Sequence, residues 1–233
     1  MQKHRLILTI CTLSIALLFS LSSQAQTGEQ RHLFSIGFNG GVQLNSIDFS
    51  PKIKQSQHMG YTGGFTARYI SEKYFAMICG AQLEVNYSLR GWKEKIEEQP
   101  EDDFFAYSRN MSYIEVPFLA HLAFGKERRG AQFFINLGPQ VGFLLSDSEK
   151  IEGDWTYPPI PIIEQHGKKI DKKFDYGITG GLGLELKTNA GNFLLEGRYY
   201  FGLSDFYKST KKDYFSRSAH NVISIRFSYL WDL

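Results

Sequence analysis

Apolar and polar side chains alternate with a period of two residues along residues 132–145. Successive side chains of a β-strand point to opposite faces, so this pattern predicts a strand with one continuously apolar face. The run is longer than an ordinary globular strand and suits a tilted strand crossing a bilayer, which needs about 9–11 residues. The residues on the apolar face are Phe133, Ile135, Leu137, Pro139, Val141 and Phe143.

The same alternation recurs along the rest of the chain and predicts about eight strands. An even number of antiparallel strands of this kind suits a small closed barrel in a membrane. We therefore expect an all-β fold, an eight-stranded antiparallel transmembrane β-barrel. The predicted strands cover residues 34–44, 61–69, 75–88, 113–122, 132–145, 175–186, 193–201 and 223–231.

The predicted connections alternate in length. Short turns are expected at residues 71–73, 125–130 and 188–191. Long loops are expected at residues 45–58, 90–109, 146–173 and 204–219. This asymmetry is typical of short periplasmic turns and long extracellular loops.

The polar stripes combine glycine with isolated charges, which fits a narrow lumen in which acids and bases pair. A soluble barrel with its apolar stripe inside is the alternative, but its outer surface would more often be rich in lysine. The charged side chains that we expect to fill the lumen are Arg68, Glu84, Glu115, Glu185, Glu196, Arg198 and Arg226. Such a network would plug the barrel, because eight strands leave room for side chains but hardly for a channel. An acid/base site or the selectivity filter of a pore are the other interpretations.

The N-terminal segment has the features of a secretory signal peptide. Lys3 and Arg5 precede a mostly apolar stretch over residues 6–21, and small residues at positions 23 and 25 predict cleavage after Ala25. We expect residues 1–25 to be removed and residues 26–233 to form one barrel domain in the cell outer membrane.

Composition narrows the candidate partners and cofactors. Without the two basic residues of the signal segment, 24 basic residues face 24 acidic ones, which gives no support for a nucleic-acid partner. The mature chain keeps only Cys79, so no internal disulfide is expected, and no cysteine–histidine spacing predicts a metal or cofactor site.

Aromatic residues in the predicted long loops suggest a contact surface for a protein partner, packing among the loops, or belt anchoring in the lipid headgroups. They are Trp92, Phe104, Phe105, Tyr107, Trp155 and Tyr157. The acidic residues at positions 97–103 favour a solvated loop over a divalent-cation site.

A hydrolase would need a nucleophile, a base and an orienting group within mutual reach. His121 is the only histidine on an inward stripe, and His58, His166 and His220 lie in or beside loops with no spacing that links them in a triad. We therefore expect a non-enzymatic barrel that contacts outer-membrane lipid and acts structurally or docks a partner through its outer loops. A narrow porin-like channel, a secretion-system accessory and a lipid-modifying enzyme are the alternatives.

Several motifs in order along the chain resemble the PorT-like outer-membrane β-barrel family. They are Tyr113-Ile114-Glu115-Val116-Pro117-Phe118, Gly138-Pro139, Gly181-Leu182-Gly183-Leu184-Glu185 and Arg198-Tyr199-Tyr200-Phe201-Gly202-Leu203. The resemblance implies an eight-stranded barrel in a Gram-negative outer membrane. The family takes its name from a secretion-associated member, but most of its members look generic and the name does not assign that role. An envelope or secretion-system protein is a candidate partner. The chain departs from the usual aromatic end of such barrels by adding Asp232-Leu233 after Trp231.

Overall fold

The computed structural model describes residues 29–95, 106–127, 129–152 and 164–233. The described residues form β-strands and connections, and none of them belongs to a helix long and apolar enough to cross a membrane. The strands are β1 (Glu29–Ser50), β2 (Gln55–Ser56), β3 (His58–Tyr74), β4 (Met77–Glu94), β5 (Ala106–Gly125), β6 (Gly130–Glu152), β7 (Phe174–Thr188), β8 (Gly191–Gly202) and β9 (Arg217–Asp232).

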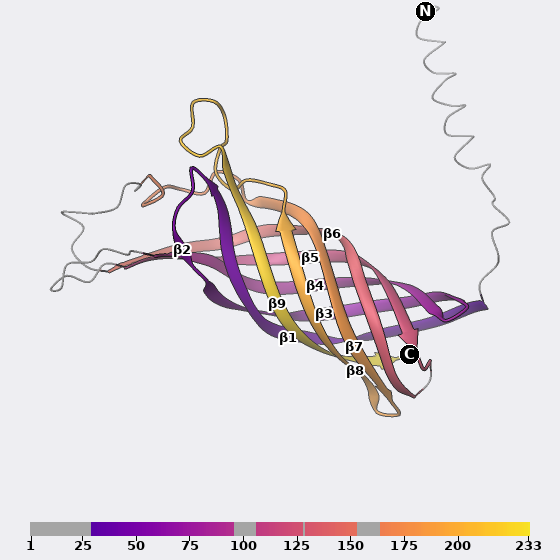
Figure 1. The fold of residues 1–233 in the computed structure, drawn as a ribbon. Coiled ribbons are helices and arrows are strands. Elements are labelled where there is room, and N and C mark those ends of the chain that lie inside the picture. The colour runs from indigo at the N-terminus through magenta and orange to yellow at the C-terminus, as the bar shows by residue number, and fades with distance from the viewer. Residues whose placement is uncertain (1–28, 96–105, 128, 153–163) are drawn as a thin grey trace, which may run out of the picture.

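Eight of these strands form a closed antiparallel ring (Figure 1). Around the ring the order is β4, β3, β1, β9, β8, β7, β6 and β5, and β5 pairs again with β4 to close it. The two-residue strand β2 is a short addition that pairs with the end of β4. The predicted eight-stranded transmembrane barrel is confirmed.

The outer face of the barrel carries the predicted apolar stripes. Exposed large apolar side chains come from every long strand, with Phe38, Phe118, Leu182 and Ile225 among them. Aromatic residues gather toward the strand ends, as expected for belts at the two membrane–water interfaces. Those nearer the short turns include Phe34, Tyr69, Phe124 and Trp231, and those nearer the long connections include Tyr61, Tyr87, Phe174, Tyr176 and Tyr199.

The strands on the side of the long connections are longer than the sequence pattern predicted. β1 continues to Ser50, β4 runs on to Glu94, β5 begins at Ala106 and β6 reaches Glu152, all within stretches predicted to be loops. Beyond the lipid, an outward side chain no longer needs to be apolar, so the alternation fades while the backbone pairing continues. The prediction of loops at residues 45–58, 90–109, 146–173 and 204–219 was therefore wrong at both ends of the first two and at one end of the other two.

One short turn lies elsewhere than predicted. Residues 71–73 belong to β3, which continues past a register shift between Ile70 and Glu72 and ends at Tyr74. Phe75 and Ala76 make the turn instead. The turns at residues 125–130 and 188–191 lie where they were predicted, and the C-terminus is at the same end of the barrel (Figure 1).

The orientation of the stripes predicts how an added charge acts on the outer face. Leu182→Arg, in the middle of β7 where the side chain is 57% exposed, should destabilise the folded barrel in lipid vesicles by about 2–4 kcal/mol. The matched change Leu203→Arg, just beyond the end of β8, should cost about 0–1 kcal/mol because a cation near the interface reaches water. Urea unfolding followed by tryptophan fluorescence measures both, and equal losses would contradict this orientation.

Candidate functional site

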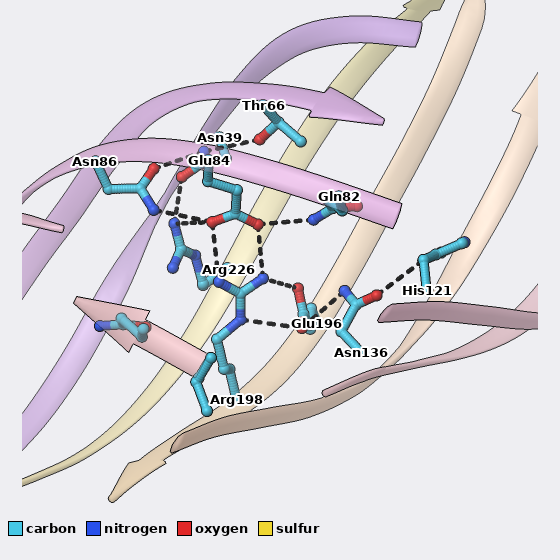
Figure 2. Close-up of polar contacts among 12 residues, drawn as sticks. Asn39, Thr66, Gln82, Glu84, Asn86, His121, Asn136, Glu196, Arg198 and Arg226 are labelled. Carbon is cyan, nitrogen blue, oxygen red and sulfur yellow. Dashed lines mark hydrogen bonds and ion pairs between the residues drawn. The ribbon is translucent and has the colours of Figure 1, made fainter. Parts of the chain in front are cut away.

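A guanidinium group lies between two carboxylates at the centre of the barrel (Figure 2). Arg198 of β8 donates two hydrogen bonds to Glu84 of β4, of 2.9 and 2.8 Å, and two to Glu196 of its own strand, of 3.0 and 2.7 Å. Because β8 and β4 are four places apart in the ring of eight, the Arg198–Glu84 pair spans the lumen. Bidentate geometry of this kind is the strongest form of a charge-assisted hydrogen bond.

Amide side chains satisfy the remaining oxygens of the central acids. Gln82 and Asn86 donate to Glu84 at 2.7 and 2.8 Å, and Asn136 donates to Glu196 at 3.1 Å. The Nδ1 atom of His121 lies 2.8 Å from the Oδ1 atom of Asn136. Buried carboxylates therefore have neutral donors as well as cations around them, which reduces the cost of taking their charge out of water.

A second arginine joins the central cluster from the last strand. Arg226 of β9 approaches Glu84 at 3.2 Å and donates a hydrogen bond to the Oδ1 atom of Asn39 on β1. Asn39 in turn donates to Thr66 on β3 at 2.9 Å and to Asn86 on β4 at 2.8 Å. One hydrogen-bonded layer, with Asn136 of β6 and His121 of β5 included, thus connects seven of the eight barrel strands.

Nearer the short turns, a separate bidentate pair also spans the lumen. Arg68 of β3 donates to the two carboxylate oxygens of Glu185 on β7 at 2.8 and 2.7 Å. β3 and β7 are again four places apart in the ring. The side chains of both residues are at most 1% exposed, so this pair is a second brace between opposite walls.

Nearer the long connections, Arg90 of β4 forms a third charged group. It donates to Glu115 on β5 at 2.6 Å and to Asp175 on β7 at 2.7 Å. Its guanidinium carbon lies 5.0 and 4.5 Å from the ring centroids of Tyr113 and Tyr200, distances within the range of cation–π attraction. The Tyr200 hydroxyl donates to Asp175 at 2.7 Å, so aromatic rings and charges share this layer.

The lumen is balanced in charge and nearly filled. The buried charged residues in the described part of the chain comprise six cations, Arg68, Arg90, Arg109, Lys187, Arg198 and Arg226. They also comprise six anions, Glu84, Glu94, Glu115, Asp175, Glu185 and Glu196. The cavity between the central and outer charged groups leaves about 10 Å³ for the centres of water molecules, which corresponds to about one water.

Apolar side chains close the lumen on both sides of the charged layers. Toward the short turns, a cluster of buried residues contains Ile70, Ile78, Ala123, Phe134, Leu194 and Leu230. Toward the long connections, a larger cluster contains Ile47, Phe49, Ile53, Trp92, Tyr107, Met111, Tyr113, Leu144, Phe206, Tyr207 and Phe215. A hydrated ion moving along the barrel axis would have to pass both clusters.

Arg109 fastens the outer cluster to the connections above it. It donates to Glu149 at 2.5 Å, to the backbone oxygen of Lys168 at 2.6 Å and to the Tyr207 hydroxyl at 3.0 Å, and it also bonds to Asp147. Burial raises the pKa of Tyr207 well above its usual value despite the nearby guanidinium, so the hydroxyl stays neutral. The connections at residues 164–173 and 203–216 are thereby held over the outer mouth of the barrel.

The structure brings the seven charged residues proposed from the sequence into the lumen. They fall into three groups: Glu84, Glu196, Arg198 and Arg226 at the centre, Arg68 with Glu185 on one side, and Glu115 on the other. Arg198 bridges to Glu84 on the opposite wall of the barrel. Arg90 and Asp175 were not among the predicted lumen charges, although Arg90 continues the even-numbered inward stripe of Glu84.

Two residues of the proposed loop contact surface are in the interior of the protein. Trp92 on β4 and Tyr107 on β5 are fully buried in the outer apolar cluster, so the proposal of a contact surface was wrong for them. Strands β4 and β5 continue beyond the membrane, which keeps these inward-facing side chains inside the barrel. Phe104, Phe105, Trp155 and Tyr157 lie outside the described residues, as does the acidic stretch at 97–103.

The histidines in the described part of the chain do not assemble with a nucleophile. His121 contacts Asn136, and the buried His220 lies 3.1 Å from the Tyr113 hydroxyl. His166 contacts Glu94 at 3.1 Å and stacks on the ring of Tyr107. No group of three or more His, Cys, Asp or Glu side chains in the same residues has the arrangement of a metal site.

A closed ring of eight strands with an apolar outer face and a charged interior defines an outer-membrane β-barrel. The family model described as outer membrane protein beta-barrel domain matches residues 24–208, and the chain belongs to this family. The protein therefore lies in the cell outer membrane. Comparison with the curated proteins finds no match.

Several solved structures are similar to this chain. OprG from Pseudomonas aeruginosa is 11% identical with a TM-score of 0.44, and the match covers 88% of this chain and 98% of OprG. Ail, the attachment invasion locus protein of Yersinia pestis, is 11% identical with a TM-score of 0.34, covering 87% and 99%. Neisserial surface protein A is 11% identical with a TM-score of 0.35, covering 84% and 96%.

Removing the central guanidinium should strongly destabilise the barrel. Arg198→Ala leaves Glu84 and Glu196 buried without their shared partner, so we expect a loss of about 3–5 kcal/mol in the free energy of unfolding. The control Arg217→Ala breaks a partly exposed pair with Asp48 and should cost about 1 kcal/mol or less. Urea unfolding of both variants in lipid vesicles gives the values, and a loss for Arg198→Ala no larger than the control would refute the role of this cluster.

The Arg68–Glu185 pair allows a double-mutant cycle. Arg68→Met or Glu185→Met alone leaves a buried charge unpaired and should cost about 3–5 kcal/mol, whereas the double change should cost far less than the sum because neither charge remains. The same unfolding measurement yields the coupling energy. A coupling near zero would mean that the two side chains do not depend on each other.

Proposed function

We propose that this protein is a non-enzymatic outer-membrane barrel with a plugged lumen, which stabilises the envelope or docks a partner through its outer loops. The observation that carries the proposal is the sequence of layers along the barrel axis. Charged groups that pair across the lumen fill its middle, and apolar clusters close it on both sides. This arrangement favours mechanical stability over transport.

The paired charges and the apolar clusters along the barrel axis do not fit a porin-like channel. A selective pore presents a ring of one sign of charge to a water-filled path. Here the buried charges balance, and Arg198 and Glu84 occupy the axis that a solute would follow. An ion would have to displace a bidentate pair and then cross an apolar cluster without water.

The enzyme alternative lacks support from the described residues. His121 and His220 are buried, and their ring nitrogens lie within hydrogen-bond distance of Asn136 and the Tyr113 hydroxyl. Ser204 donates to Asp175 at 2.5 Å, and Asp175 is engaged by Arg90, so neither is disposed as a nucleophile beside a free base. These contacts favour structural roles for all of these side chains.

The motifs that resemble the PorT-like family have packing roles in this barrel. Glu115 binds Arg90, and Tyr113 lies against the same guanidinium. A Cβ atom at Gly181 would lie 2.1 Å from Glu196, and one at Gly183 would lie 2.3 Å from Phe134. These contacts indicate that the motif residues serve to fill the lumen of a narrow barrel. A role as a secretion-system accessory is a less supported proposal, which cross-linking in native membranes followed by purification would test.

Conductance separates the plug from the pore. In planar bilayers the purified protein should show no steady conductance, and Arg198→Ala should add none, because both apolar clusters remain in place. A porin-like channel would conduct, and loss of Arg198 from its lumen would change the reversal potential in a salt gradient. Arg217→Ala, which changes a partly exposed residue at the start of β9, controls for changes outside the lumen. Steady conductance of the unaltered protein would overturn the proposed function.

A further inference from the structure

Basic side chains from three parts of the chain converge at the periplasmic base of the barrel. Lys73 of β3 lies 2.5 Å from one carboxylate oxygen of Glu127, and Arg31 of β1 donates to the other at 3.2 Å. Glu127 belongs to the turn between β5 and β6, which also carries the exposed Lys126 and Arg129. Together with Gly125, these residues line a hollow of about 700 Å³ that opens outward.

The hollow has a clear excess of positive charge. Its lining contains four cations, Arg31, Lys73, Lys126 and Arg129, against the single carboxylate of Glu127. Hydrogen bonding to Lys73 lowers the pKa of that carboxyl group, so it is charged at neutral pH. Glu29, which does not line the hollow, forms an ion pair with Arg31 at 2.5 Å and offsets part of its positive charge. The remaining excess, centred on Lys126 and Arg129, suits an anionic ligand.

The position of the hollow along the membrane normal indicates which anions it meets. Phe124 and Phe133 face outward on the strands that flank the turn and belong to the aromatic residues at this end. Lys126 follows Phe124 by two residues, a distance of about 7 Å at most along a strand. The polar headgroup region beyond the hydrocarbon core is about 5–8 Å thick on each side. The basic side chains therefore lie at the level of the lipid phosphates.

A second feature of the same end supports contact with lipid headgroups. Phe75, in the turn between β3 and β4, is 86% exposed and has a φ of 51°. A bulky residue is uncommon in this left-handed conformation, where glycine or asparagine is favoured. An aromatic ring at the tip of a turn is stabilised when it lies in the membrane interface, so the base of the barrel is immersed in the headgroup region.

We propose that the hollow binds the headgroup phosphate of an anionic phospholipid in the inner leaflet of the outer membrane. Lys126 and Arg129 contact the phosphate, Arg31 and Lys73 add to the positive potential, and the acyl chains lie along the outward side chains of Phe124 and Phe133. The site does not depend on whether the lumen is closed. Its specificity is for negative headgroups over zwitterionic ones, since the recognition is by charge.

The test compares two lipids on the full mature protein in detergent. Native mass spectrometry measures retention of palmitoyl-oleoyl phosphatidylglycerol and of the matching phosphatidylcholine. The unaltered protein should retain the phosphatidylglycerol more strongly. Each basic residue near an anionic surface contributes about fivefold to affinity, so the double variant Lys126→Gln and Arg129→Gln should weaken phosphatidylglycerol binding by at least about tenfold. Its binding of phosphatidylcholine should not change.

Two further variants exclude general effects of charge and of the ion pairs. The double variant Lys211→Gln and Lys212→Gln removes two exposed lysines at the opposite end and should leave lipid retention unchanged. Glu127→Gln removes the one acid of the hollow, and phosphatidylglycerol affinity should rise. If the ion pairs only fasten the base of the barrel, Glu127→Gln would lower stability without raising affinity, which would overturn the proposal.

Other results would also overturn it. Equal retention of the two lipids by the unaltered protein would show that no headgroup site exists. An equal loss in the Lys211 and Lys212 variant would indicate nonspecific attraction. If the Lys126 and Arg129 variant kept its lipid binding but no longer sedimented with purified peptidoglycan, the hollow would be a site for the cell-wall polymer.

Discussion

The structure depends on the need to pair every charge that the narrow barrel encloses. Arg198 meets this need by bridging β8 to Glu84 on the opposite wall, and Arg68 with Glu185 repeats the solution one layer away. Other inward residues bond to these charged pairs or leave space for them. Amides such as Gln82 and Asn136 satisfy the remaining oxygens, and the absence of a side chain at Gly181 leaves space for Glu196. The interior therefore functions as a polar core, cross-linked between walls that are far apart in the ring.

The sequence was sufficient to predict which side of each strand faces lipid, because inside the membrane the two faces have opposite requirements. It was insufficient to predict where the strands end. Beyond the bilayer, Lys93 and Ser108 face each other across β4 and β5 while the outward apolar signal has already stopped. Backbone pairing needs no particular side chain, so composition alone does not reveal it. The turn at Phe75 was displaced for a related reason, since a register shift in β3 changes which residues alternate.

The residues of the candidate site were predictable wherever the alternation of inward-facing and outward-facing positions could be followed along a strand. Glu84 and Arg90 share one inward stripe, and continuing that stripe past the apparent strand end would have found Arg90 and placed Trp92 inside. Which acid meets which base was not predictable, because the partners belong to strands on opposite walls. That choice depends on the stagger of the whole ring, which no local pattern encodes. Loop-like composition around Tyr107 also concealed a buried strand.

The join between the first and last strands has a consequence for movement through the wall. β1 and β9 pair continuously over sixteen positions, from Ser35 with Asp232 to Ser50 with Arg217. Inside the barrel, Arg226 of β9 bonds to Asn39 of β1 at the middle of this seam. Some barrels release hydrophobic cargo sideways through a weak seam into the bilayer. The β1–β9 seam is paired along its full length and bonded from within, so it provides no such route for lateral exchange between lumen and lipid.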